Sequence, residues 1–108
     1  MFRQDFIKRQ IELFAAALAR LAGAREKGDL EQASSELGNA YRALGVDPAL
    51  LELDAQTIVR MLRTREKLEA LCQLLEEHAQ LNEAQGERAE ALSLRTRAEA
   101  IRRAQVKP

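Results

Sequence analysis

The chain has 108 residues, and Ala, Glu, Lys, Leu and Arg account for 66 of them. A share above about half is typical of helical bundles and long-helix proteins. Val, Ile and Thr number only ten and aromatic residues make up 4%, so the residue types that build strands are scarce. Composition therefore excludes a sheet and predicts one all-α domain, with a modest core that needs no disulfide or metal.

The charges balance overall but are unevenly distributed along the chain. Seventeen basic and seventeen acidic side chains give a formal net charge of zero, whereas a nucleic-acid-binding protein normally carries a basic excess. Residues 1–27 carry a net charge of +3, residues 28–87 of −7 and residues 88–108 of +4. Basic ends around an acidic middle can pair within one fold or between two chains, or they can be ordinary solvated helix faces.

Targeting signals and cysteine usage point to the cytoplasm. Cys72 is the only cysteine, so no intrachain disulfide can form, which fits a reducing compartment. Residues 13–19 resemble the apolar core of a signal peptide, but the run has only seven residues and is flanked by Asp5, Glu12 and Arg20. No uncharged run approaches the ~20 residues that a membrane span needs. We expect a soluble cytoplasmic protein with no membrane partner.

The first predicted element is a long amphipathic helix over residues 5–27, with Asp5 as its N-cap. Its apolar stripe repeats with alternating spacings of four and three, and consists of Ile7, Ile11, Phe14, Leu18 and Leu21. Gly28 breaks this helix, and a second helix follows over residues 30–44 until Gly45 ends it. Because the turn between them is so short, the two helices are expected to form an antiparallel hairpin.

The middle of the chain predicts short helices. Asp47 followed by Pro48 is a strong helix-start signal and predicts a turn or two over residues 49–53. Asp54 is the expected N-cap of another short helix, and Thr64 is a cap or kink before the next long one.

Two more long helices are predicted after Thr64. The first, over residues 65–85, has a broad apolar face and is expected to be the most buried element. Gly86 ends it, and a last helix covers residues 88–104 before a polar tail at residues 105–108. The prediction is thus a single domain over residues 1–104, made of two antiparallel hairpins joined by short helices, five to six helices in total.

The two hairpins share a turn pattern fifty-eight residues apart. Gly28-Asp-Leu-Glu-Gln-Ala33 aligns with Gly86-Glu-Arg-Ala-Glu-Ala91. This resembles the inter-helix turn of the tetratricopeptide repeat, in which an acidic and then an aromatic or apolar residue follow Gly, and Ala stands five residues after it. Positions that match the repeat are Ala33, Leu37, Ala40, Leu75, Ala79, Ala91 and Ala98. Positions that depart from it, being polar where the repeat is apolar, are Arg20, His78, Asn82 and Arg95.

A plain pair of helical hairpins is the alternative interpretation of the same pattern.

A second resemblance lies at the start of the chain. The segment Phe2-Arg-Gln-Asp-Phe-Ile-Lys-Arg9, which leads into a long helix and a Gly-Asp turn, is similar to the opening of certain uncharacterised bacterial helical proteins. Because that family has no established activity, the resemblance implies no catalytic residue.

The sequence shows no cluster of reactive side chains. His78 is the only histidine, and Cys72 lies about 120° away from it around a helix, so the two cannot act as one nucleophile or ligand pair. Cys-x-x-Cys, His-Glu-x-x-His and glycine-rich phosphate loops are all lacking. We expect no catalytic, cofactor-binding or metal-binding residue, and so not an enzyme.

The last predicted helix is strongly basic and suggests an alternative function. Its cations, with one more in the tail, are Arg88, Arg95, Arg97, Arg102, Arg103 and Lys107. They would suit a nucleic-acid-binding accessory protein, although no aromatic residue is interleaved for base stacking. We favour a solvated or internally paired face, and nucleic acid is not the expected partner.

The function that these observations favour is a non-enzymatic protein–protein interaction or assembly module. If the tetratricopeptide resemblance holds, it implies a polar, acidic groove suited to a basic or polar peptide, formed by Gln73, Glu76, Gln80 and Glu83, with Arg25 from the first hairpin. The equivalent positions of the first hairpin, Ala15, Leu18 and Ala22, are too apolar to leave in water. We expect other helices or a second copy to cover them.

Self-association is the sharper prediction, because two hairpins are fewer than the three repeats that a solenoid usually needs. The first helix carries apolar residues on more than one flank, and a symmetric homodimer that pairs the first helices would bury them. The candidate self-association face consists of Phe6, Ile7, Ile11, Leu13, Phe14 and Leu18. A compact monomer could absorb the same residues.

Overall fold

The computed structural model describes residues 2–106, and every regular element in that range is a helix. The elements in chain order are α1 (Phe2–Glu26), α2 (Leu30–Leu44), the 3₁₀ helix η1 (Pro48–Glu52), α3 (Ala55–Leu62), α4 (Arg65–Ala84) and α5 (Arg88–Val106). The all-α class, the long and short helices and their order are therefore as the sequence predicts.

Side-chain caps fix where the inner helices begin. The carboxylate of Asp29 accepts a hydrogen bond from the Gln32 amide at 3.1 Å, and that of Asp54 accepts one from Thr57 at 2.8 Å. The Thr64 hydroxyl accepts from the Lys67 amide at 3.2 Å. Each bond satisfies an amide that lacks a partner in the first turn of a helix, so these polar residues end one element and start the next.

The residue at which the first helix begins and the residue at which the last helix ends differ from those predicted. The first helix begins at Phe2, so Asp5 lies in its first turn and is not the N-cap. There its negative charge still stabilises the helix, because the amide end carries a partial positive charge. The last helix runs through Val106, which takes two residues from the expected polar tail, and residues 107–108 lie outside the described range.

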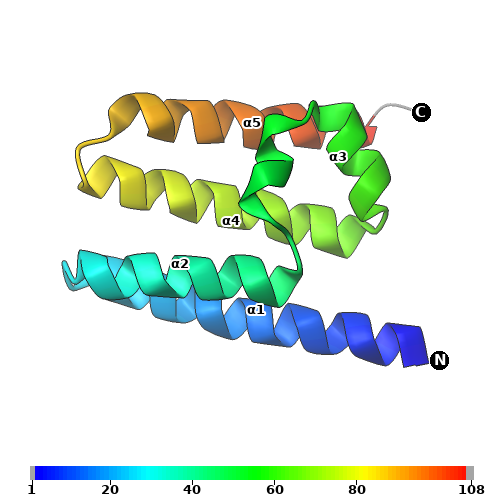
Figure 1. Ribbon diagram of the computed structural model, residues 1–108, viewed down its shortest axis with the longest axis horizontal. Helices are drawn as coiled ribbons and strands as arrows, with labels where there is room; N and C mark the ends of the chain where they lie inside the picture. The colour runs from blue at the N-terminus through cyan, green and yellow to red at the C-terminus, as the bar shows by residue number, and fades with distance from the viewer. Residues whose placement is uncertain (1, 107–108) are drawn as a thin grey trace.

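The two hairpins pack side by side into a flat body of 40 × 30 × 20 Å. Figure 1 shows α1 with α2 in one antiparallel pair and α4 with α5 in the other, with α4 nearest the first hairpin. From the end of α2, the chain passes through η1 and α3 to the C-terminal end of α5 (Figure 1). α4 thus contacts all four other α-helices.

The core is centred on α4, as its broad apolar face predicts. Eight of its 20 residues are buried, and these are Leu68, Ala70, Leu71, Cys72, Leu74, Leu75, Ala79 and Leu81. Phe14 and Ala17 of α1 and Ile58 of α3 join the main buried cluster. Burial of these side chains away from water is the main driving force that holds the two hairpins together.

A strained turn connects α3 to α4. The backbone of Arg63 has φ 67° and ψ −42°, a conformation that residues other than glycine rarely adopt. The Thr64 amide donates to the Leu62 carbonyl at 2.7 Å, which makes Arg63 the central residue of a γ-turn. This tight turn reverses the chain within two residues and lets Ile58 of α3 pack into the core above α4.

Candidate interaction groove

A hollow of about 480 Å³ lies between α1 and the first half of α4. Its α1 wall is apolar and consists of Ile11, Phe14 and Ala15, and its α4 wall consists of Arg65, Glu66, Glu69, Ala70 and Gln73. We call this hollow the α1–α4 groove. Ala15 is exposed and Ile11 half-buried, while Phe14 forms the floor and is 2% exposed. One wall is thus apolar, and the other is mostly polar, with two carboxylates and one guanidinium.

Three residues of this wall, Glu66, Glu69 and Gln73, belong to a polar stripe that runs the length of α4. Its members repeat with alternating spacings of three and four, and are Glu66, Glu69, Gln73, Glu76, Gln80 and Glu83. This spacing keeps a set of residues on one side of a helix, and here five of the six are exposed while Glu76 is half-buried. The stripe has two halves that differ in how their carboxylates are engaged.

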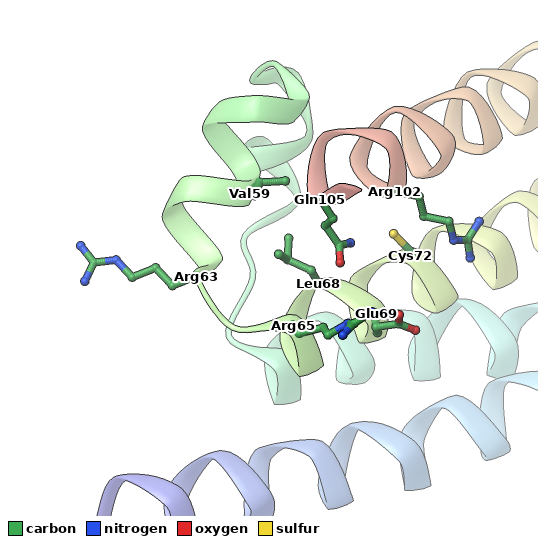
Figure 2. A pocket seen from close by; sticks show the side chains of 8 residues that line it. All are labelled: Val59, Arg63, Arg65, Leu68, Glu69, Cys72, Arg102 and Gln105. Carbon is green, nitrogen blue, oxygen red and sulfur yellow. The ribbon is translucent and has the colours of Figure 1, made fainter. Parts of the chain in front are cut away.

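In the C-terminal half, arginines from other helices neutralise the carboxylates. Glu83 accepts two hydrogen bonds from Arg95 at 2.5 and 3.0 Å, which hold the pKa of that carboxyl below its usual value. Glu76 pairs with Arg102 at 2.6 Å. Among the described side chains, by contrast, Glu66 and Glu69 form no ion pair within 4.0 Å. No described arginine of another helix pairs with these two carboxylates, and Arg65 of α4 lies beside Glu69 (Figure 2).

The structure separates the five residues that the sequence assigns to a binding groove. Gln73 lines the hollow, and Gln80 is exposed further along the same stripe. Glu76 and Glu83 instead hold α5 through the ion pairs described above. Arg25 reaches across from α1 to Glu77 at 3.4 Å, and both side chains are about one-fifth exposed. Four of the five thus lie outside the hollow, and three of them connect helices.

The sequence analysis did not single out two carboxylates that line the groove, Glu66 and Glu69. Glu66 and Glu69 continue the three-and-four spacing of the predicted set toward the start of α4, so the same pattern would have found them. Ile11 was assigned to a self-association face, and it lies instead in the groove wall. The equivalent apolar positions of the first hairpin are partly covered: Leu18 and Ala22 are half-buried, while Ala15 stays exposed.

The predicted self-association face is divided between the interior and the surface. Phe14 is 2% exposed and belongs to the core, so its assignment to an outer face is wrong. Ile11 and Leu18 pack against the same core, and Ile7 is half-buried. Phe6 and Leu13 are the two members that remain largely exposed. The predicted set mixes two stripes on different sides of α1.

The histidine and the cysteine face different helices. The Nδ1 atom of His78 lies 3.0 Å from the hydroxyl of Tyr41 on α2, and burial lowers the pKa of the imidazole. The Cys72 thiol donates to the Ala98 carbonyl of α5 at 3.6 Å, and burial raises its pKa. Both groups have neutral local partners and fill space between helices.

The basic face of α5 is largely engaged with the rest of the chain. Arg95 and Arg102 pair with α4, and Arg103 pairs with Glu99 on its own helix at 2.6 Å. Arg97 donates to the Leu53 carbonyl at 2.5 Å. The basic ends of the chain and its acidic middle therefore pair within one fold. This is one of the three arrangements that the charge distribution allows. Three of the five described cations of α5 are thus in ion pairs.

A larger hollow of about 660 Å³ lies where α3, the start of α4 and the end of α5 meet. Figure 2 shows that the side chain of Arg63 points away from it into solvent, while Arg65 lies beside Glu69 and Arg102 extends along α4. Because these guanidinium groups do not converge, the hollow offers no built site for an anion.

Two kinds of feature are absent from the described part of the chain. Residues 2–106 contain no group of three or more His, Cys, Asp or Glu side chains placed to hold a metal ion. Over the same range, no helix has both the length and the apolar composition of a membrane span. Comparison with known proteins gave no match either: no family model, no curated protein and no solved structure is significantly similar to the chain.

Proposed function

We propose that this protein is a non-enzymatic interaction module that binds a basic amphipathic helix or peptide in the α1–α4 groove. The observation that carries the proposal is the pairing of an apolar wall, Ile11 and Ala15, with the two unpaired carboxylates of Glu66 and Glu69. A cytoplasmic setting belongs to the proposal, because the one cysteine, Cys72, is a buried free thiol.

The groove suits a helix that is apolar on one side and basic on the other. Apolar side chains of the ligand would pack on Ile11, Ala15 and the floor formed by Phe14, which removes apolar surface from water. Lysines or arginines on its flank would reach Glu66 and Glu69 and set both orientation and association rate. Arg65, at the end of the same wall, would repel a second cation there and so limit where the basic residues lie.

The tetratricopeptide resemblance supports the same proposal. In that family, helical hairpins present the first helix of each pair toward a bound peptide. α1 and α4 are the first helices of the two hairpins here, and the groove lies between them. The proposal does not need homology, because the physical complementarity would be the same for any pair of hairpins.

Fluorescence anisotropy with a defined peptide tests the proposal. The probe is a labelled 14-residue Leu–Lys peptide patterned as an amphipathic helix, and its Leu–Glu counterpart is the negative control. We expect saturable binding of the Leu–Lys peptide and none of the Leu–Glu peptide. The double variant Glu66→Lys, Glu69→Lys should lose tenfold or more in affinity, because two attractive contacts become repulsive.

A matched variant separates the groove from net charge. Glu31 and Glu52 are exposed and do not line the groove, so Glu31→Lys with Glu52→Lys makes the same charge change elsewhere. This control should bind the Leu–Lys peptide within about twofold of the wild-type chain. Equal losses in both double variants would mean that the peptide senses overall charge, and the groove assignment would be wrong.

A further inference from the structure

One exposed stripe of α1, made of three apolar residues and two arginines, lies outside the α1–α4 groove. Its five members are all exposed and repeat with alternating spacings of three and four: Phe6, Arg9, Leu13, Ala16 and Arg20. Phe6 is 62% and Leu13 57% exposed, which is unusual for two large apolar side chains seven residues apart on one face. Paired helices contact each other along residues whose spacing averages 3.5, as it does here. We call these five residues the outer stripe.

We propose that a second copy of the chain covers the outer stripe, with the two α1 helices antiparallel about a two-fold axis at Leu13. The stripe is self-complementary in that arrangement, because residue i then lies opposite residue 26 − i. Leu13 meets Leu13 of the second copy on the axis, and Phe6 lies opposite Arg20. This surface is separate from the α1–α4 groove, so the inference is independent of the proposed function.

The side chains of the outer stripe match one another in this register. Phe6, Leu13 and Arg20 are spaced by seven and form one row, and Arg9 and Ala16 form the other. A two-fold axis perpendicular to the helices places each row against the same row of the second copy. Arg9 then lies opposite position 17, next to the small Ala16 of the second copy, which allows the axes to approach to about 8–10 Å.

Charge favours the antiparallel over the parallel arrangement. Parallel helices would place Arg9 against Arg9 and Arg20 against Arg20, and like charges directly opposite are destabilising. In the antiparallel arrangement Arg20 meets the ring of Phe6 instead, a favourable cation–π contact. Arg20 also pairs with Glu36 of α2 at 3.1 Å and is still 55% exposed, so its guanidinium remains accessible to a second copy.

The second copy is also the occupant that the size of the stripe suits. A single helix–helix seam lies at or below the low end of specific interfaces, about 1,200 Å² in total. Within that area a two-fold arrangement makes each contact of the outer stripe twice, because residue i contacts residue j and residue j contacts residue i. We therefore expect a dimer that forms and dissociates in the micromolar range.

Sedimentation equilibrium from 5 to 200 µM tests the proposal. The mass should rise from 12.1 kDa toward twice that value as concentration increases. Leu13→Glu should remain monomeric at 200 µM, and because Leu13 is exposed the variant should keep its helical circular dichroism. The matched control is Leu92→Glu: Leu92 is 66% exposed on α5, and its replacement should leave the dimer intact.

Three outcomes would overturn the proposal. A wild-type mass that stays at 12.1 kDa up to 200 µM would exclude the dimer. A dimer unaffected by Leu13→Glu would place the interface elsewhere. Loss of association in Leu92→Glu as well would indicate that α1 of one copy stacks on α5 of the next, a head-to-tail arrangement without the two-fold axis.

Disulfide trapping tests the register itself. Leu13→Cys should form a covalent dimer on mild oxidation, since the two sulfurs would meet on the axis. Phe6→Cys should not, because fourteen residues separate its two positions along the helix axis, about 20 Å. The wild-type chain is the control, since its only thiol, Cys72, is 1% exposed. Efficient trapping of Phe6→Cys would indicate parallel helices and contradict the inference.

Discussion

Replacing Leu75 by alanine tests the central position of α4. The side chain is 0% exposed and belongs to the main buried cluster, which draws on every α-helix of the chain. Truncation of a fully buried leucine removes its transfer free energy and leaves a cavity, which together cost about 3–5 kcal/mol. A domain of this length is stable by roughly 5–15 kcal/mol, so one side chain would account for a large fraction of the total.

Urea unfolding followed by circular dichroism at 222 nm measures this cost. With a slope of about 1.5 kcal/mol per molar urea, the midpoint should fall by roughly 2–3 M while the slope stays unchanged. Leu92→Ala is the control, because that leucine is 66% exposed and its truncation should cost less than about 0.5 kcal/mol. A loss below 1 kcal/mol for Leu75→Ala would refute the packing of both hairpins on α4.

Three further predictions concern stability and charge. Because burial lowers the pKa of His78, the folded chain keeps the imidazole neutral while the unfolded chain binds a proton below pH 6.5. Stability should therefore fall as the pH drops from 6.5 to 5, and His78→Phe should flatten that part of a urea-midpoint profile; an unchanged profile would contradict the burial. Arg63→Gly should raise the free energy of unfolding by about 1 kcal/mol, since glycine adopts a positive φ without strain, and a decrease would show that the γ-turn costs nothing. In mobility-shift assays at 150 mM salt, we expect no retardation of a 20-base-pair DNA duplex or single-stranded RNA, because ion pairs engage Arg95, Arg102 and Arg103. Tight binding that collapses with added salt would revive the nucleic-acid alternative.

Much of the fold could be predicted because single residues mark where helices end. Gly28, Asp29, Gly45 and Asp54 each impose a conformation or a hydrogen bond that acts within a few residues, and the structure places a helix end at each of them. At Gly45 the backbone is left-handed, with φ 75°, and an added Cβ would lie 3.2 Å from the Gln10 amide nitrogen. Local chemistry of this kind is visible in a sequence.

The start of α1 and the γ-turn could not be predicted in the same way. Asp5 is the first residue of a capping type in the predicted helix, but the helix begins at Phe2, three residues earlier. Nothing about an arginine signals a positive φ, because tertiary packing of α3 on α4 and α5 imposes the turn at Arg63. Both features depend on contacts that a local pattern does not contain.

The candidate site was only partly predictable for a related reason. Spacing shows that Glu76 and Glu83 share a side of α4, but it does not show which carboxylates meet an arginine from α5. Nor does it show which of the two apolar stripes of α1 packs inward, so Phe14 in the core and Leu13 on the surface were assigned to one face. Only the packing of the hairpins resolves such choices.

The most direct test of the proposed function is a nuclear magnetic resonance titration of ¹⁵N-labelled protein with the Leu–Lys peptide. We expect amide shifts concentrated in residues 11–15 and 66–73, which form the two walls of the α1–α4 groove, and little change over residues 88–106. No shifts at saturating peptide, or shifts centred on α5, would contradict the proposal that this groove binds a basic amphipathic partner.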